Sequence, residues 1–328
     1  MKPDPAREGQ ANNIATPSAE AISRAAELLR AGEVIGLPTE TVYGLAGDGL
    51  NPAALAKIFD VKQRPLFDPL ILHVPDADAA FALADDVPEV ARVLAGKFWP
   101  GPLTLVLRKK EFVPDLATSG LPNVAVRVPH HPVAQALLRA FAGPLAAPSA
   151  NRFGRISPTD AQAVHAELGD GVALILDGGP CTVGVESTVI SLAESTPVLL
   201  RAGGVSLEEI EALIGPVSHA TPVDEKPQAP GQLKHHYAPR KKLRLVRSVE
   251  EIPARADVGW LAFGKAAAFP GVVENISPGE NLREAASAFF RALRKLDEDA
   301  RVAEIYAVRL PARGLGVAIN ERLERASA

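Results

Sequence analysis

Residues 34–45 read VIGLPTETVYGL, a short apolar run followed by a loop that is rich in hydroxyl groups. The run from Val34 to Leu37 predicts a buried strand, which delivers Pro38 to Thr41 into that loop. Further apolar runs of similar length alternate along the chain with segments of helical period. This alternation predicts a mixed α/β fold. Because most runs do not alternate with polar residues, we expect helices to cover at least one face of the sheet.

The predicted strands and helices fall into two groups on either side of a proline-rich segment. In the first group, Thr16 should cap a helix that Gly32 ends. The other expected helices cover residues 51–59, 90–98, 132–141, 160–168 and 207–214, and the strands cover 34–37, 70–74, 103–107, 124–128, 173–176, 187–192 and 198–201. The second group has strands at 243–246, 258–263 and 305–310 and helices at 281–296 and 317–325.

Composition sets the expected domain boundaries. Residues 1–15 are polar and should form a disordered lead-in, with a first domain at 16–215. Residues 216–240 contain several prolines and no apolar periodicity, which predicts a semi-rigid linker. Residues 241–328 then form a smaller α/β domain.

Charge and cysteine content exclude several classes of protein. The net charge of −4 argues against a protein that coats nucleic acid through a global positive field. Cys181 is the single cysteine, so a disulfide framework and a cysteine zinc site are excluded and a cytoplasmic location is favoured. Cys181 itself should be a small buried or half-buried hydrophobe. No apolar run reaches the roughly 20 residues that span a bilayer, so no membrane association is expected.

The hydroxyl-rich segment PTETVYGL at 38–45 is one of five short polar segments, which we call polar islands. The other four are KQRP at 62–65, DPLILH at 68–73, SAN at 149–151 and LLRAGG at 199–204. Lys62 and Arg64 are either ordinary surface charges or a pair that surrounds a polyphosphate. Arg127 lies inside an apolar strand, where a cation needs an anion, either a structural carboxylate or a ligand. The SAN island supplies small donors suited to phosphate or carboxylate oxygens.

Two motifs are rejected as sites. Gly259 to Lys265 fits the skeleton of a phosphate-binding loop, but Ala266 replaces the required Ser or Thr and the intervening residues are strand-like. The histidine pairs at 130–131 and 235–236 are adjacent in sequence, so their side chains should diverge. No residue is therefore assigned as a metal ligand.

Together these features resemble the threonylcarbamoyl-AMP synthase family, the YrdC-like enzymes of tRNA modification. The resemblance runs from Ile22 to Leu213 and includes all five islands in order. It continues through PGQLKHHYAP at 230–239 to GLGVAINERLERA at the C-terminus, which looks like the longer, two-domain form. One departure is Asp68, because the family commonly has asparagine there.

The resemblance implies a YrdC-like twisted mixed sheet with helices, followed by a Rossmann-like C-terminal domain. The implied reaction is a nucleotidyl transfer that makes threonylcarbamoyl-AMP and pyrophosphate from L-threonine, bicarbonate and ATP, with Mg²⁺ accompanying ATP. The implied partners are a downstream threonylcarbamoyl-transferase complex and, as a further candidate, tRNA.

Site residues are carried over motif by motif. The ATP side would comprise Lys62, Arg64, Asp68, Asn123, Asn151, Thr159, Arg201 and Tyr237, and the threonine side would comprise Thr41, His73, Arg127, Ser149 and Ser187. Lys62 and Arg64 should stabilise charge as pyrophosphate leaves, and Arg127 should hold the threonine carboxylate with two hydrogen bonds. Asp68 would need a metal or these cations to sit near a triphosphate.

Two rival functions and one structural hypothesis accompany this interpretation. A non-catalytic RNA-binding role would show no nucleotide turnover in the absence of RNA. A carbamoyl transferase of the hydrogenase-maturation type also uses a YrdC-like domain, but its additional domains would add length and cysteines. The structural hypothesis is that residues 230–239 fold over the groove as a lid and place Tyr237 against the nucleotide, rather than serving as a simple tether.

Overall fold

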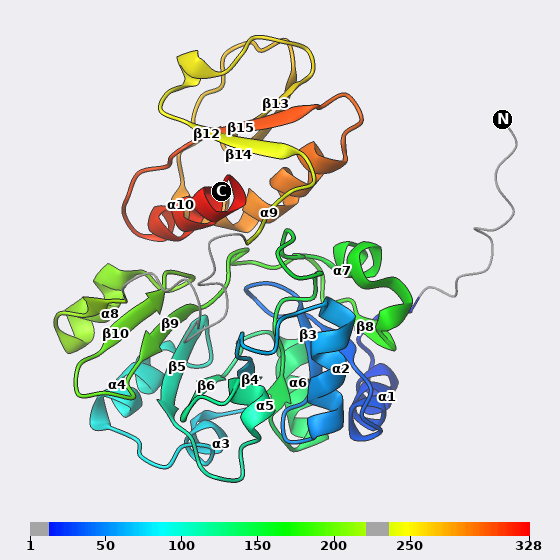
Figure 1. The fold of residues 1–328 in the computed structure, drawn as a ribbon, viewed down its shortest axis with the longest axis vertical. Coiled ribbons are helices and arrows are strands. Elements are labelled where there is room, and N and C mark those ends of the chain that lie inside the picture. Colours follow the sequence, from blue (N-terminus) through cyan, green and yellow to red (C-terminus); the bar gives the residue numbers. More distant parts are fainter. Residues whose placement is uncertain (1–12, 221–235) are drawn as a thin grey trace, which may run out of the picture.

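The computed structural model describes residues 13–220 and 236–328, which form two α/β units stacked on one another (Figure 1). The strands of the first unit are β1 (Ile14–Ala15), β2 (Ile35–Leu37), β3 (Gly44–Asp48), β4 (Ile71–His73), β5 (Leu103–Arg108), β6 (Asn123–Arg127), β7 (Leu145–Ala146), β8 (Leu174–Leu176), β9 (Thr188–Ser191), β10 (Val198–Arg201) and β11 (Ser218–His219). They form one mixed sheet in the order β1-β8-β2-β3-β7-β4-β6-β5-β9-β10-β11.

Helices pack on both faces of part of this sheet. They are α1 (Ala19–Arg30), α2 (Pro52–Lys62), α3 (Ala77–Phe81), α4 (Glu89–Phe98), α5 (Asp115–Thr118), α6 (Pro132–Phe141), α7 (Ala161–Leu168) and α8 (Leu207–Ile214). On one face, Leu29 of α1 and Leu137 of α6 pack in one cluster with Leu37 of β2. A larger cluster on the other face includes Leu55 of α2 and Leu94 of α4. The prediction of a mixed α/β sheet with at least one covered face is confirmed.

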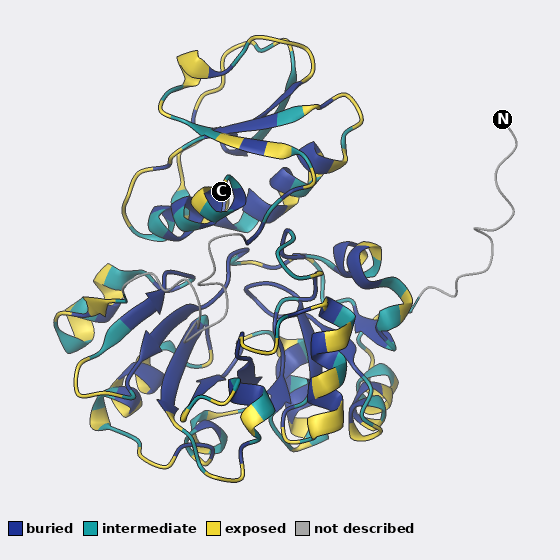
Figure 2. Cartoon of the chain, viewed as in Figure 1, coloured by how far each residue is buried: buried dark blue, intermediate teal, exposed yellow. Residues whose placement is uncertain are grey.

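The second unit is a four-stranded parallel sheet with two helices. Its elements are β12 (Lys242–Val246), β13 (Val258–Phe263), β14 (Val272–Ser277), α9 (Leu282–Glu298), β15 (Glu304–Val308) and α10 (Leu315–Ala326), and the strand order is β12-β15-β13-β14. Both helices lie between this sheet and the first unit (Figure 1). One hydrophobic cluster contains Val185 and Ala202 of the first unit together with Phe289 and Phe290 of α9, so the two units share a core. Figure 2 shows the first sheet as largely buried; in the second sheet, β13 and β15 are mostly buried, whereas β12 and β14 are mostly not.

Three details of the N-terminal and linker segments differ from expectation. Helix α1 begins at Ala19 with Ser18 as its N-cap, so the prediction that Thr16 caps this helix is wrong. Residues 1–12 of the predicted lead-in lie outside the described residues, but Ile14 and Ala15 pair in parallel with β8. Likewise, β11 lies within the predicted linker and pairs with β10. Both are edge strands of two residues, too short to give a pattern in sequence.

Strand β3 was not predicted because it is rich in glycine. A Cβ atom at Gly44 would lie 3.0 Å from the Cβ of Ala147, and one at Gly47 would lie 3.1 Å from Ile58 Cδ1. Small residues are therefore required where this strand passes its neighbours. Elsewhere, Cys181 is buried as expected, and β13 confirms that the rejected phosphate-loop motif at 259–265 begins as a strand. Within the described residues, no helix has the length and apolar character needed to cross a membrane.

Candidate active site

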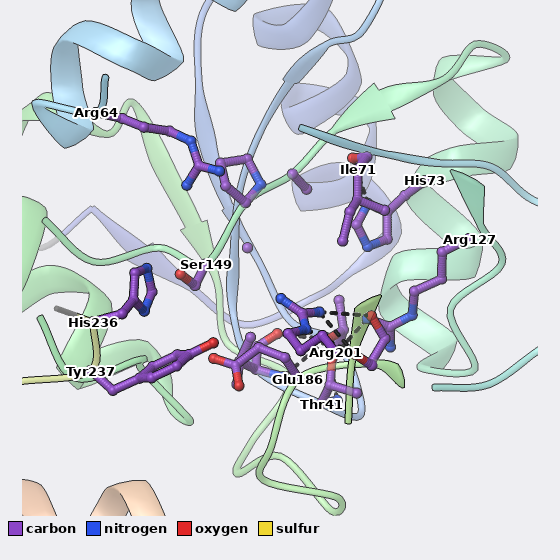
Figure 3. Close-up of a pocket in the computed structure, with 16 residues that line it drawn as sticks. Thr41, Arg64, Ile71, His73, Arg127, Ser149, Glu186, Arg201, His236 and Tyr237 are labelled. Carbon is purple, nitrogen blue, oxygen red and sulfur yellow. Dashed lines mark hydrogen bonds between the residues drawn. The ribbon is translucent and has the colours of Figure 1, made fainter. Parts of the chain in front are cut away.

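Several strands of the first sheet end at one polar pocket (Figure 3). β4 and β6 are parallel neighbours, and their register places His73 beside Arg127, the last residue of each strand. Ser187 directly precedes β9, and Arg201 is the last residue of β10. Strand ends in open α/β sheets are common places for ligands to bind. Of the predicted site residues, the pocket is lined by Thr41, Arg64, His73, Arg127, Ser149, Ser187, Arg201 and Tyr237.

All five residues predicted for the threonine side thus lie at this pocket. Thr41 lies in the loop that follows β2, and its hydroxyl is 2.9 Å from that of Thr39. The Ser187 hydroxyl lies 2.7 Å from that of Thr104 on the neighbouring strand β5. Arg201 donates to the carbonyl of Ser187 and to its hydroxyl. Hydroxyl groups and cations are therefore held in fixed positions by the sheet.

Arg127 is buried and bound to a carboxylate of its own chain. Its Nη2 lies 2.6 Å from Glu40 Oε1, its Nη1 donates to the Thr41 hydroxyl at 2.9 Å, and its Nε donates to the carbonyl of Gly101. Glu40 also accepts from the backbone N–H of His130. Burial by itself would raise the pKa of Glu40, but the Arg127 guanidinium outweighs it and the pKa is lowered. Glu40 is therefore the structural carboxylate that one interpretation of Arg127 required, while Arg127 itself lines the pocket.

His73 is neutral in this environment. Burial, together with the nearby Arg127 guanidinium, lowers the pKa of His73 to about 3. Its Nδ1 lies 3.2 Å from the carbonyl of Ile71, so Nδ1 carries the proton if this contact is a hydrogen bond and Nε2 is then an acceptor. A neutral imidazole at this position can orient an amine or hydroxyl group without adding charge.

The predicted cations of the ATP side are buried and engaged with backbone carbonyl groups. Lys62 ends α2, and its ammonium group donates to the carbonyls of Ser149 and Asn151. Burial and the neighbouring Arg64 hold the pKa of Lys62 well below its usual value. Arg64 lines the pocket and donates to the carbonyls of Asp68 and Pro69. Neither Lys62 nor Arg64 is therefore an ordinary surface charge, because their hydrogen bonds connect the segments 62–65, 68–73 and 149–151.

The remaining predicted ATP residues do not line the pocket. Four of them are buried: Lys62, Asp68, Asn151 and Thr159. Lys62 lies directly behind the pocket wall, because it donates to the carbonyl of the wall residue Ser149 and also to that of Asn151. Asp68 lies there too, because it is paired with the wall residue Arg64. Asn123 lies at the opposite end of β6 from Arg127, and four residues of strand span about 13 Å. Its assignment to ATP stays a prediction without support from this pocket.

His236 and Tyr237, from the end of the predicted linker, form one wall of the pocket (Figure 3). Tyr237 has a left-handed backbone with φ of 64°, which is uncommon for a non-glycine residue. Its ring packs against Phe290, and its buried hydroxyl has no hydrogen-bond partner among the described residues. The same holds for Nδ1 of His236. Residues 230–235 lie outside the described residues.

Sequence reasoning did not single out the buried ion pair that lies behind this wall. Glu186 lines the pocket, accepts from the Ser157 hydroxyl at 2.6 Å and binds Nε of Arg322 at 3.0 Å. Arg322 comes from α10 in the second unit, also donates to the carbonyl of Ala202, and lies 5.5 Å from the centre of the Tyr237 ring. Burial would raise the pKa of Glu186, but Arg322 and Arg201 hold it below its usual value. The second unit therefore supports the pocket wall directly.

Family models match nearly the whole chain. One, described as telomere recombination, matches residues 27–203, and another, described as the threonylcarbamoyl-AMP synthase C-terminal domain, matches residues 205–328. The chain is 42% identical over 321 residues to the threonylcarbamoyl-AMP synthase of Pyrococcus abyssi, covering 92% of this chain and 93% of that protein. It is 40% identical to the Bacillus subtilis enzyme of the same name, covering 93% and 92%.

The structure also resembles that of P. abyssi Sua5 complexed with L-threonine, with a TM-score of 0.87 and 40% identity over 93% of this chain and 94% of that one. The fold, the pocket at the strand ends and the second domain together define a two-domain enzyme of the YrdC-like class. The chain belongs to the threonylcarbamoyl-AMP synthase family.

Proposed function

We propose that this enzyme is a nucleotidyltransferase that makes threonylcarbamoyl-AMP and pyrophosphate from L-threonine, bicarbonate and ATP. The observation that carries the proposal is the convergence of the threonine-side residues with Arg64 and Arg201 on one pocket. L-threonine as a substrate is supported by the threonine complex of the P. abyssi relative. Because the product is a mixed anhydride that hydrolyses readily, a transferase must take it onward, and tRNA modification is the use that the family implies.

The chemistry asks mainly for positioning and charge stabilisation. The threonine amine and bicarbonate give a carbamate and one molecule of water, and an oxygen of the carbamate attacks the α-phosphorus as the bond to pyrophosphate breaks. Arg127 would hold the threonine carboxylate, and neutral His73 would orient the amine. Arg64 and Arg201 would face the phosphates and stabilise the charge on the leaving pyrophosphate. No covalent intermediate with the protein is required.

Magnesium would accompany ATP, because a bound divalent cation lowers the charge repulsion on the phosphates. Among the residues that the structure describes, no group of three or more His, Cys, Asp or Glu side chains is arranged to hold a metal by itself. Magnesium at nucleotide sites commonly uses one or two carboxylates together with substrate phosphates. Asp68 lies behind the pocket wall and is paired with Arg64 at 2.8 Å, so the phosphate oxygens would supply most of the ligands of the ion.

The activity is tested by measuring pyrophosphate release with each substrate omitted in turn. We expect release only when ATP, L-threonine and bicarbonate are all present with magnesium. Equal release without threonine would show a plain ATP pyrophosphohydrolase. The absence of turnover under every condition without RNA would favour the RNA-binding alternative.

We also propose that the segment 230–239 closes the pocket and protects the labile product. His236 and Tyr237 at the pocket wall support this function, since each places there a buried polar atom that has no hydrogen-bond partner among the described residues. Replacing residues 230–239 by a Gly/Ser linker of equal length keeps the tether and removes the wall. We expect weaker ATP retention and faster loss of product to hydrolysis, measured by nucleotide binding and by product yield over time.

The matched control replaces residues 221–229 by a Gly/Ser segment and leaves the 230–239 motif intact. It should behave like the unmodified enzyme. If the 230–239 replacement keeps full nucleotide affinity and product yield, the segment is a passive tether.

A further inference from the structure

A buried hydroxyl group outside the pocket contacts a hydroxyl group inside it. Thr104 lies in the apolar strand β5 and is 0% exposed, and its hydroxyl is 2.7 Å from that of Ser187. Among the described residues, the Thr104 hydroxyl has no other hydrogen-bond partner. Valine would fill nearly the same space without burying a polar atom, so the hydroxyl group at this position needs an explanation.

The other contact of Ser187 assigns the direction of this hydrogen bond. Ser187 Oγ accepts from Nη2 of Arg201 at 3.2 Å, because a guanidinium group can only donate. Ser187 Oγ is also the single acceptor for the Thr104 hydroxyl among the described residues, and buried polar groups are nearly always satisfied. Thr104 therefore donates to Ser187, and both lone pairs of Ser187 Oγ are occupied.

This arrangement restricts what Ser187 offers to the pocket that it lines. A serine hydroxyl ordinarily donates one hydrogen bond and accepts two, but here only the proton is left for a ligand. The group therefore suits an acceptor oxygen, such as that of a carboxylate or an alcohol. It does not suit an ammonium group, which has no acceptor.

We propose that Thr104 is a positioning residue for L-threonine, which directs the Ser187 proton to an oxygen of this substrate. The inference rests on the proposed function, in which Ser187 belongs to the threonine side of the pocket. Thr104 holds the Ser187 hydroxyl in one donor direction before the substrate enters, so less freedom is lost on binding. Without the Thr104 hydroxyl, one lone pair of Ser187 is free and its proton has more than one direction.

The test measures threonine affinity by calorimetric titration of the full chain. Thr104→Val removes the donor with little change of shape, and we expect L-threonine to bind about threefold to tenfold more weakly, as for the loss of one neutral hydrogen bond. Thr104→Ser keeps the hydroxyl group and should bind threonine like the unmodified enzyme. Affinity for a non-hydrolysable ATP analogue should stay within about twofold in both variants.

A double variant shows whether Thr104 acts through Ser187. Ser187→Ala should itself weaken threonine binding, and Thr104→Val added to it should cause no further loss. The matched control is Thr118→Val, which removes a buried hydroxyl of α5 that donates to the carbonyl of Leu121. It should lower the melting temperature and leave threonine affinity unchanged.

Unchanged threonine affinity in Thr104→Val would overturn the proposal. An equal loss from Thr104→Val with and without the Ser187 hydroxyl would also overturn it, because Thr104 would then act by another route. If Thr104→Val does not fold, Ser187→Ala still decides, since unchanged threonine affinity there removes the group through which Thr104 acts. Failure of the unmodified enzyme to bind threonine would instead contradict the proposed function.

Discussion

Replacement of Arg322 by alanine should lower the free energy of unfolding by about 3–5 kcal/mol, because it leaves the buried Glu186 without its charged partner. The Arg322 side chain is 1% exposed and that of Glu186 is 8% exposed, so water cannot solvate the remaining carboxylate well. The same change removes the cation beside the Tyr237 ring. We therefore expect loss of both stability and synthase activity from a substitution in the second domain.

Urea denaturation measures this effect, and Arg309→Ala is the matched control. Arg309, which directly follows β15, forms an exposed ion pair with Glu324 of α10, and such pairs contribute about 0–1 kcal/mol. A double variant, Arg322→Met with Glu186→Gln, should recover part of the stability because it buries no unpaired charge. A loss below about 1 kcal/mol in Arg322→Ala would show that the ion pair does not hold the two domains together.

Arg127→Lys should weaken threonine binding by about tenfold to a hundredfold, corresponding to the loss of a charge-assisted hydrogen bond of about 1.5–3 kcal/mol. Lysine keeps the charge and a contact to Glu40, but it cannot make a two-point contact with a carboxylate. ATP affinity should change much less. Calorimetric titration with threonine and with nucleotide separates the two effects.

Arg64→Lys provides the comparison, because it makes the same change on the phosphate side of the pocket. It should weaken nucleotide binding and largely spare threonine. If Arg127→Lys leaves threonine affinity intact while the protein melts at a lower temperature, the pair with Glu40 is the whole function of Arg127.

Sequence patterns predicted the parts of the site that local structure determines. The strands ending at His73, Arg127 and Arg201 were recognised because buried strands carry continuous apolar runs. Arg127 was also expected to need an anion, since a lone cation in an apolar strand is costly. Glu40 is that anion, and although it lies within the first quoted segment, no local pattern links it to a residue so distant in sequence.

Contacts between the two domains lay beyond such reasoning. Helical periodicity predicted α10, but an arginine on a helix ordinarily lies in solvent. Arg322 is buried only because α10 packs on the first domain, where Glu186 and the carbonyl of Ala202 receive it. The resemblance to the family supplied the threonine-side residues, and the register of β4 and β6 explains why two of them are adjacent.

The most direct test of the central claim is detection of the product itself. The full-length enzyme is incubated with ATP, L-threonine, magnesium and isotope-labelled bicarbonate, and the mixture is analysed at once by mass spectrometry. The account predicts threonylcarbamoyl-AMP that carries the label from bicarbonate, formed in equal amount with pyrophosphate and absent when threonine is omitted. AMP and pyrophosphate formed without threonine, with no labelled adduct, would contradict it.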